Sequence, residues 1–322
     1  MKAIRVQHHG GADVLVLREQ PVPELKPEQA LVKISVSGVN YLDVYFRNGQ
    51  NPLPLPYTPG VEAVGVVVAN GHGVNEVNVG DRVAYALVQG SYAEYAAVPA
   101  SKLVPVPSEL SDNLAAAALL QGMTAHYLSH DAYPIRQGNV VLIHAGAGGV
   151  GLLLTQLARR RGARVLVTVS NEEKARRARE AGADVTINYA EADFESEVSN
   201  ATEGRGVDVV YDSVGRQTFE KSLRCLKPRG TLVLCGASSG SVPPFDPMVL
   251  NTRGSLYLTR PSLAHYIADR ATLLKRAGDI LRWVADGELR LHVGHICPLA
   301  DAARAHSLLE SRATSGKLLL QP

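Results

Sequence analysis

The feature of the sequence that most constrains the fold is a glycine-rich turn between a short apolar strand and an apolar helix. Val140-Val141-Leu142-Ile143 is typical of a buried strand, and a helical pattern covers residues 150–161. The turn that joins them, His144-Ala145-Gly146-Ala147-Gly148-Gly149-Val150-Gly151, contains the spacing G-x-G-x-x-G. Strand, turn and helix in this order predict the first unit of a doubly wound α/β domain.

The glycines of this turn have separate uses. The first permits the tight turn, the second lets the backbone approach a pyrophosphate, and the third lets the helix pack closely on the strand. The helix N-terminus adds N–H donors and positive potential, which favour an anion. The turn therefore predicts a dinucleotide site, and the residues expected to contact the dinucleotide are Gly146, Gly148, Gly149, Val150 and Gly151.

Strands and helices continue to alternate after the turn, which is the pattern of a parallel sheet. Further strands are predicted at residues 165–169, 185–187, 207–211 and 231–235, with a helix at residues 172–181 between the first two. We expect residues 121–258 to form one Rossmann domain.

The first third of the chain has a different pattern. Short β-rich runs, such as residues 30–36 and 65–68, are separated by turns rich in Gly and Pro. Four prolines, at positions 52, 54, 56 and 59, exclude a helix or central strand there and predict a rigid loop. A long helix near residues 270–286 and a strand at 317–320 follow the Rossmann segment. We expect residues 1–120 and 259–322 to form the β-rich domain together.

Charge and composition exclude several classes of function. The 322 residues include 33 basic and 31 acidic side chains, a formal net charge of +2, so no strong field attracts nucleic acid or an anionic membrane. The basic run at residues 159–164 is typical of a solvated helix end, and a local RNA-binding patch is its alternative. The N-terminal residues contain neither a signal h-region nor a membrane-spanning run, so we expect a cytoplasmic protein.

The end of the second predicted strand indicates which dinucleotide binds. An NAD enzyme carries Asp or Glu there to hold the ribose 2′-OH, whereas this strand ends in Val169-Ser170-Asn171. A hydroxyl and the nearby Lys174 suit a 2′-phosphate. The alternative is that Glu172 and Glu173 only complement the helix dipole and that the cations form a solvated face.

Further motifs lie outside the glycine turn. Gly38-Val39-Asn40-Tyr41-Leu42-Asp43-Val44-Tyr45-Phe46-Arg47-Asn48-Gly49 has the form GVN-x-x-D-x-Y-x-R-x-G, and Gly60-Val61-Glu62-Ala63-Val64-Gly65 the form G-x-E-x-x-G. Tyr211-Asp212-Ser213-Val214-Gly215 ends a predicted strand. With these motifs the chain resembles, over nearly its whole length, the zinc-free quinone oxidoreductases of the medium-chain dehydrogenase/reductase superfamily.

The resemblance implies an α/β fold with a GroES-like catalytic domain, a doubly wound Rossmann domain and NADPH as cofactor. It implies that Asn40 and Tyr45 lie near the nicotinamide and that Thr124 lies in the catalytic cleft; these three are the expected catalytic residues. The remaining residues implied to hold NADPH are Ser170, Lys174, Tyr189, Ser213, Ser238, Ser239 and Arg312. For Tyr45 and Tyr189, the alternative is a core or rim aromatic.

The zinc ligands of related alcohol dehydrogenases are missing from the sequence. Their positions are occupied by residues 37–40 and by Val61, which cannot bind a metal. The three cysteines, Cys225, Cys235 and Cys297, are odd in number and far apart, which favours structural thiols. His8, His9 and His144 have no partner at ligand spacing, so we expect no metal site.

The resulting hypothesis is an NADPH-dependent reductase that transfers hydride to quinones without a metal. The first alternative is a 2-alkenal or enone reductase of the same fold. The second is a non-catalytic NADPH-binding protein, structural or RNA-associated. The resemblance also implies a homodimer formed through a strand at residues 255–259.

Overall fold

The computed structural model describes residues 1–311 and 314–322, and its contacts divide the chain into two compact units. One unit contains Met1–Met123 and Ile267–Pro322, and the other contains Thr124–Tyr266. The boundaries predicted from the sequence, after residues 120 and 258, lie three and eight residues before these. Helix α2 (Asp112–Tyr127) contains both the predicted and the observed first boundary, so one continuous helix joins the two units.

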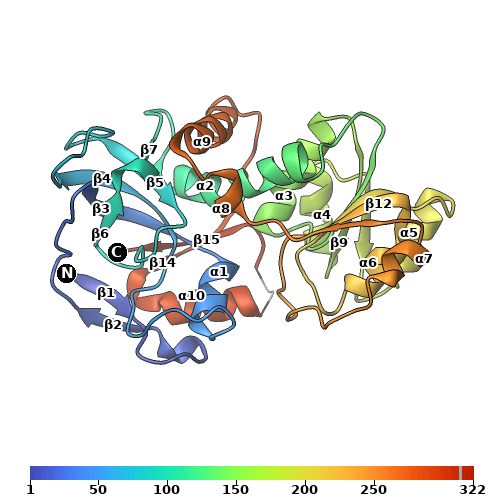
Figure 1. The fold of residues 1–322 in the computed structure, drawn as a ribbon, viewed down its shortest axis with the longest axis horizontal. Coiled ribbons are helices and arrows are strands. Elements are labelled where there is room, and N and C mark those ends of the chain that lie inside the picture. Colours follow the sequence, from blue (N-terminus) through green and yellow to red (C-terminus); the bar gives the residue numbers. More distant parts are fainter. Residues whose placement is uncertain (312–313) are drawn as a thin grey trace. The chain divides into compact units, whose positions relative to one another are not determined.

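The second unit is built on a six-stranded parallel sheet (Figure 1). Its strand order is β10-β9-β8-β11-β12-β13, so the first strand in sequence, β8, lies near the middle. The strands are β8 (Val140–Ile143), β9 (Arg164–Val169), β10 (Val185–Asn188), β11 (Val207–Asp212), β12 (Leu226–Leu234) and β13 (Tyr257–Thr259). The helices are α3 (Gly149–Arg160), α4 (Glu172–Glu180), α5 (Phe194–Thr202), α6 (Phe219–Arg224), α7 (Met248–Thr252) and α8 (Leu263–Tyr266). The predicted doubly wound domain is confirmed.

The sheet forms because its strands are apolar on both faces. Val141, Leu142, Val165, Leu166 and Val210 are completely buried, as expected for parallel strands covered by helices on both sides. Parallel pairing brings the carboxyl ends of β8 to β12 to one edge of the sheet. Strands β9 and β10 follow β8 toward one edge of the sheet, whereas β11, β12 and β13 continue toward the other edge. Ligands of such sheets bind at this switch point, between β8 and β11.

The first unit is a β-rich domain, as predicted. Its main sheet has the order β14-β15-β3-β4-β5-β7, with β6 paired to β3, and a separate hairpin joins β1 to β2. The strands are β1 (Lys2–Arg5), β2 (Val16–Glu19), β3 (Gln29–Val39), β4 (Glu62–Asn70), β5 (Arg82–Ala86), β6 (Tyr95–Pro99), β7 (Val104–Pro105), β14 (Val293–Pro298) and β15 (Lys317–Gln321). Its helices besides α2 are α1 (Tyr41–Arg47), α9 (Arg270–Ala285) and α10 (Ala302–Glu310).

Two features of this unit position the residues discussed below. Strand β15 pairs antiparallel with β3, so the C-terminal segment lies directly beside the residues that precede α1. Strand β3 is packed tightly against β4 at Gly65, where an added Cβ would lie 2.1 Å from the carbonyl oxygen of Lys33.

None of the helices in the described residues has the length and apolarity needed to cross a bilayer.

Candidate functional site

The glycine turn is a cradle that side chains would fill. Gly148 is the N-cap of α3 and has an extended backbone. A Cβ at Gly151 would lie 2.4 Å from the carbonyl oxygen of Ala145, and one at Gly146 would lie 2.5 Å from the Cβ of Val167. The turn therefore stays close to β9 and leaves the amide groups at the start of α3 uncovered by side chains, which fits a dinucleotide pyrophosphate.

The residues predicted to hold a 2′-phosphate gather at the end of β9. The Nζ of Lys174 donates to the Ser170 hydroxyl over 3.0 Å, and the backbone N–H of Lys174 is capped by the Asn171 side chain. Tyr189 follows β10, its amide donates to the Val169 carbonyl over 3.0 Å, and its side chain is 43% exposed. The Lys174 ammonium and the Ser170 hydroxyl are thus in contact at the sheet edge, and the backbone of Tyr189 is bonded to the same end of β9.

The acids of α4 are paired within the same helix. Glu172 pairs with Arg179, and Glu173 pairs with Arg177 over 2.7 Å. Each acid thus has a cation of its own other than Lys174. The solvated-face alternative applies to these pairs, whereas Lys174 is hydrogen-bonded to Ser170.

Loops after β11 and β12 complete the same edge of the sheet. The amide of Ser238 donates to the Ser213 carbonyl over 3.2 Å. The hydroxyl of Ser239 donates to the Val214 carbonyl over 2.7 Å and accepts from the Gln217 amide over 3.1 Å. Cys235 begins the second loop, and burial raises the pKa of its thiol to about 12, so it is not a reactive thiolate.

His144 is the first residue of the glycine turn, and its buried side chain has a structural function. Its Nδ1 is 3.0 Å from the Thr168 hydroxyl and its Nε2 is 3.0 Å from the Ser222 hydroxyl. Ser222 in turn donates to Asp212, whose carboxylate also accepts the amides of Val214 and Gly215. Burial lowers the pKa of His144, so the ring is neutral, and it connects the end of β8 with β9 and α6.

The predicted catalytic residues are divided between the units. Asn40, which is 5% exposed, is the N-cap of α1, and the half-buried Tyr45 lies on that helix with its ring centroid 6.0 Å from that of Tyr41. Thr124 lies on α2 at the start of the second unit. Arg312 falls outside the described residues.

Sequence reasoning assigned no role to two charged residues that contact Asn40. The Nζ of Lys317 lies 2.5 Å from Oε2 of Glu62 and 2.8 Å from Oδ1 of Asn40. Nδ2 of Asn40 donates to the same Glu62 oxygen over 3.0 Å. A single lysine opening the otherwise apolar strand Lys317-Leu318-Leu319-Leu320 was the available signal.

A second buried chain of hydrogen bonds begins at Arg47. Because guanidinium only donates, Nδ1 of His306, 3.2 Å from Nη1 of Arg47, must accept, which places the ring proton on Nε2. That proton faces the Tyr92 hydroxyl at 3.0 Å, and Tyr92 donates to Oδ2 of Asp43 over 3.1 Å. Glu310 balances Arg47 through two bonds of 2.8 Å.

This hydrogen-bond network contains two ionisable groups that are both neutral between about pH 3 and 7. Burial raises the pKa of Asp43 to about 7, against the lowering effect of the Asn40 amide and the Tyr92 hydroxyl. Burial and the neighbouring charge of Arg47 lower the pKa of His306 to about 3. The core beneath α1 therefore carries its net charges on two ion pairs, Arg47 with Glu310 and Lys317 with Glu62.

A metal does not fit the positions that hold zinc in related dehydrogenases. Val61 offers no donor atom, and both polar ends of the Asn40 amide are hydrogen-bonded to Glu62 and Lys317. Within residues 1–311 and 314–322, no three His, Cys, Asp or Glu side chains are grouped so that they could hold a metal ion.

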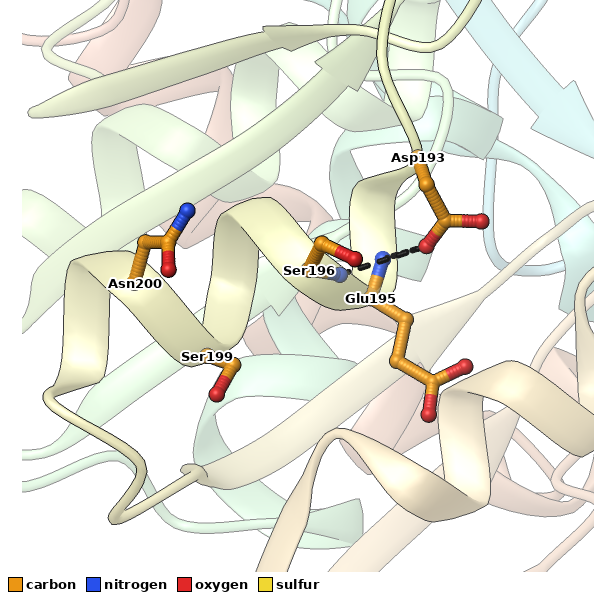
Figure 2. Close-up of a pocket in the computed structure, with 5 residues that line it drawn as sticks. All are labelled: Asp193, Glu195, Ser196, Ser199 and Asn200. Carbon is orange, nitrogen blue, oxygen red and sulfur yellow. Dashed lines mark hydrogen bonds between the residues drawn. The ribbon is translucent and has the colours of Figure 1, made fainter.

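An open polar pocket lies along α5 (Figure 2). It is lined by Asp193, Glu195, Ser196, Ser199 and Asn200. Oδ1 of Asp193 caps α5 by accepting the amides of Glu195 at 2.9 Å and Ser196 at 3.2 Å, and its other oxygen is paired with Lys221. These contacts account for the pocket as the ordinary N-terminus of a helix.

Comparison with known proteins first defines the class. Residues 26–108 match the family described as "Alcohol dehydrogenase GroES-like domain", and residues 149–272 match "Zinc-binding dehydrogenase". The chain thus has the two-domain organisation of the medium-chain dehydrogenase/reductase superfamily.

Individual relatives define the family more closely. A mycobacterial protein crystallised with NADPH is 47% identical, with a TM-score of 0.97 and full coverage of both chains. The quinone oxidoreductase of Escherichia coli, also complexed with NADPH, is 41% identical, with a TM-score of 0.98 over the whole of both chains. A 2-haloacrylate reductase of a Burkholderia species is 41% identical over 325 residues, 98% of each chain. The chain belongs to the quinone oxidoreductase family.

The opposite pKa shifts of Asp43 and His306 predict a specific pH dependence of stability. Between about pH 4 and 7 the folded state keeps a proton on Asp43 that the unfolded chain has lost, so this group makes stability fall as pH rises. Between about pH 3 and 6.5 the unfolded chain protonates His306 and the folded state does not, so this group makes stability fall as pH falls. The two slopes, each about 1.4 kcal/mol per pH unit, cancel where they overlap.

Removing one group should expose the slope of the other. We expect Asp43→Asn to lose stability as pH falls from 6.5 to 4, relative to the wild type, and His306→Gln to lose it as pH rises over the same range. Urea unfolding followed by Trp283, which lies on α9 in the same unit, measures both. Parallel pH curves for both variants and the wild type would contradict the neutral pair.

Proposed function

We propose that this protein is an NADPH-dependent reductase of quinones. The observation that carries the proposal is the end of β9, where the bond between Lys174 and Ser170 replaces the carboxylate of an NAD site beside an intact glycine cradle. The NADPH complexes of the mycobacterial and E. coli relatives support the same cofactor. The name of the E. coli relative supports the acceptor.

The mechanism assigns the chain's own residues to binding and orientation. NADPH, when bound, supplies a hydride. Lys174, Ser170 and Tyr189 hold its adenosine phosphate, while the turn from Gly146 to Gly151 holds the pyrophosphate. The hydroxyl of Tyr45 donates a hydrogen bond to the acceptor oxygen on which negative charge develops. The hydroxyl of Thr124 is the second hydroxyl to which this proposal assigns a catalytic role.

Asn40 has a different part in this proposal. Its amide is engaged by Glu62 and Lys317, so it acts by fixing the start of α1 and not by donating to the acceptor. The acceptor needs no Lewis acid, because a quinone is already electrophilic. A proton from solvent or a nearby hydroxyl completes the hydroquinone.

A second candidate is reduction of an activated alkene. The solved structure of a 2-haloacrylate reductase has the same sequence identity to this chain as that of the E. coli quinone oxidoreductase, 41%, with TM-scores of 0.87 and 0.98. NADPH oxidation measured with a panel of quinones, enals and 2-haloacrylate separates the two acceptor classes. Tight NADPH binding without oxidation by any of them would leave the non-catalytic alternative.

Lys174→Ala should weaken NADPH binding tenfold to a hundredfold and leave NADH binding nearly unchanged. The reason is that one charge-assisted contact to the 2′-phosphate is worth about 1.5–3 kcal/mol. Fluorescence titration with both cofactors measures it. Arg176→Ala, on the same helix but paired with Glu180, is the matched control. An equal loss for NADPH and NADH would contradict the 2′-phosphate role.

Tyr45→Phe should lower the rate of quinone reduction by no more than about ten- to a hundredfold, since one hydrogen bond worth about 1.5–3 kcal/mol is lost and the ring remains. Single-turnover kinetics with NADPH deuterated at the reactive carbon should show a primary isotope effect. A loss far beyond a hundredfold would contradict the role of Tyr45 as the donor of one hydrogen bond, and absence of an isotope effect would argue against direct hydride transfer.

We also propose that the protein is a homodimer formed through β13. This strand is the edge of the sheet, Tyr257 on it is 58% exposed, and Met248 and Phe245 of the same unit are also exposed. An open apolar edge strand invites pairing with another strand. Light scattering should show a dimer that Tyr257→Glu dissociates, whereas Val79→Glu, at an exposed valine of the other unit, should not. A monomeric wild type at micromolar concentration would refute this.

A further inference from the structure

The ion pair between Glu62 and Lys317 is buried to an unusual degree. Their side chains are 0% and 1% exposed, and the Nζ to Oε2 distance is 2.5 Å. The other carboxylate oxygen, Oε1, accepts the backbone amide of Leu120 on α2 over 2.6 Å. Strands β4 and β15 and helix α2 are therefore connected through one carboxylate.

Gly38 leaves the space that this pair occupies. A Cβ at this position would lie 2.2 Å from Oε2 of Glu62 and 2.8 Å from Cε of Lys317. Gly38 pairs with Leu319 across β3 and β15, so the backbone there cannot move aside without breaking the sheet. The first residue of the Gly38-Val39-Asn40 motif is thus explained by the ion pair.

The pair also determines the orientation of the Asn40 amide. Ammonium can only donate and carboxylate can only accept, so Oδ1 must face Lys317 at 2.8 Å and Nδ2 must face Glu62 at 3.0 Å. The second Nδ2 hydrogen faces the Gly38 carbonyl at 3.3 Å. A flipped amide would bring donor to donor and acceptor to acceptor.

Asn40 connects the ion pair to the first turn of α1. Its backbone amide donates to Oδ2 of Asp43 over 2.9 Å, and the amide of Asp43 donates to the Asn40 carbonyl over 3.0 Å. This reciprocal arrangement fixes the first turn of the helix. Tyr45 lies one turn further along the same seven-residue helix.

We propose that Glu62 and Lys317 are positioning residues, which hold α1 through Asn40 so that the Tyr45 hydroxyl is correctly placed for the acceptor. This inference rests on the proposed function of Tyr45. Stability alone does not require the pair, because buried ion pairs can be replaced by neutral residues without loss of stability. What neutral residues cannot supply is the fixed donor and acceptor direction.

The test is the double variant Glu62→Gln with Lys317→Met, which removes both charges and leaves no buried ion unpaired. The Leu120 amide keeps the oxygen of the new carboxamide on its own side, so the NH2 group faces Asn40 and the acceptor for Nδ2 of Asn40 is lost. The orientation that the ion pair imposes on the Asn40 amide is therefore no longer favoured. We expect kcat for quinone reduction to fall about tenfold to a hundredfold, since a small misplacement of a catalytic group has effects of this size. NADPH affinity, measured by titration, should be unchanged because its proposed phosphate contacts lie in the other unit.

A second readout does not depend on turnover. Protein labelled with 3-fluorotyrosine gives a ¹⁹F resonance for Tyr45, which Tyr45→Phe assigns. We expect this resonance to shift or broaden in the double variant. Lys33→Met, which removes an ammonium from the exposed face of β3, should change neither kcat nor the resonance.

The outcomes distinguish the two proposals. Wild-type kcat together with an unchanged Tyr45 resonance in the double variant would overturn the positioning role. So would a parallel loss of kcat and NADPH affinity, because that pattern indicates general destabilisation. If the wild type itself reduces no quinone, the proposed function fails, and the ¹⁹F resonance alone decides whether the pair holds α1.

Discussion

The parallel pairing of strands around β8 is the constraint on which the arrangement of the expected dinucleotide site depends. It brings the ends of β8, β9, β10, β11 and β12 to one edge, so residues separated by almost a hundred positions, from Gly146 to Ser239, line the same rim. His144 reinforces this edge from below by joining Thr168 to Ser222. The imidazole of His144 is neutral at this position, because burying a charged imidazole would cost more desolvation free energy.

The sequence allowed this half of the molecule to be predicted because its signals are local. Strand, glycine turn and helix follow one another within about twenty residues, and the strands are short runs made mostly of apolar residues. Helix α2 was missed, since Ala115 to Leu120 is apolar throughout and has no helical period. The roles of Glu62 and Lys317 could not be predicted, because only the pairing of β15 with β3 brings together residues 255 positions apart.

Charge burial in the first unit follows one principle. Arg47 and Lys317 are almost completely buried, and each faces a carboxylate, which offsets its desolvation. Asp43 and His306 form no such ion pair, and their shifted pKa values keep both neutral between about pH 3 and 7. The buried ionisable groups near α1 are therefore either charged and paired with an opposite charge or neutral, and a low-dielectric interior tolerates both states.

The close contact at Gly38 has a consequence for how this chain can change. A side chain at position 38 would collide with both members of the ion pair, and a smaller pair would leave the Asn40 amide without its two partners. Positions 38, 40, 62 and 317 are therefore physically coupled, so the effects of substitutions at two of them on stability should not add. Four sites spread over nearly the whole length of the chain thus form one unit of packing and hydrogen bonding.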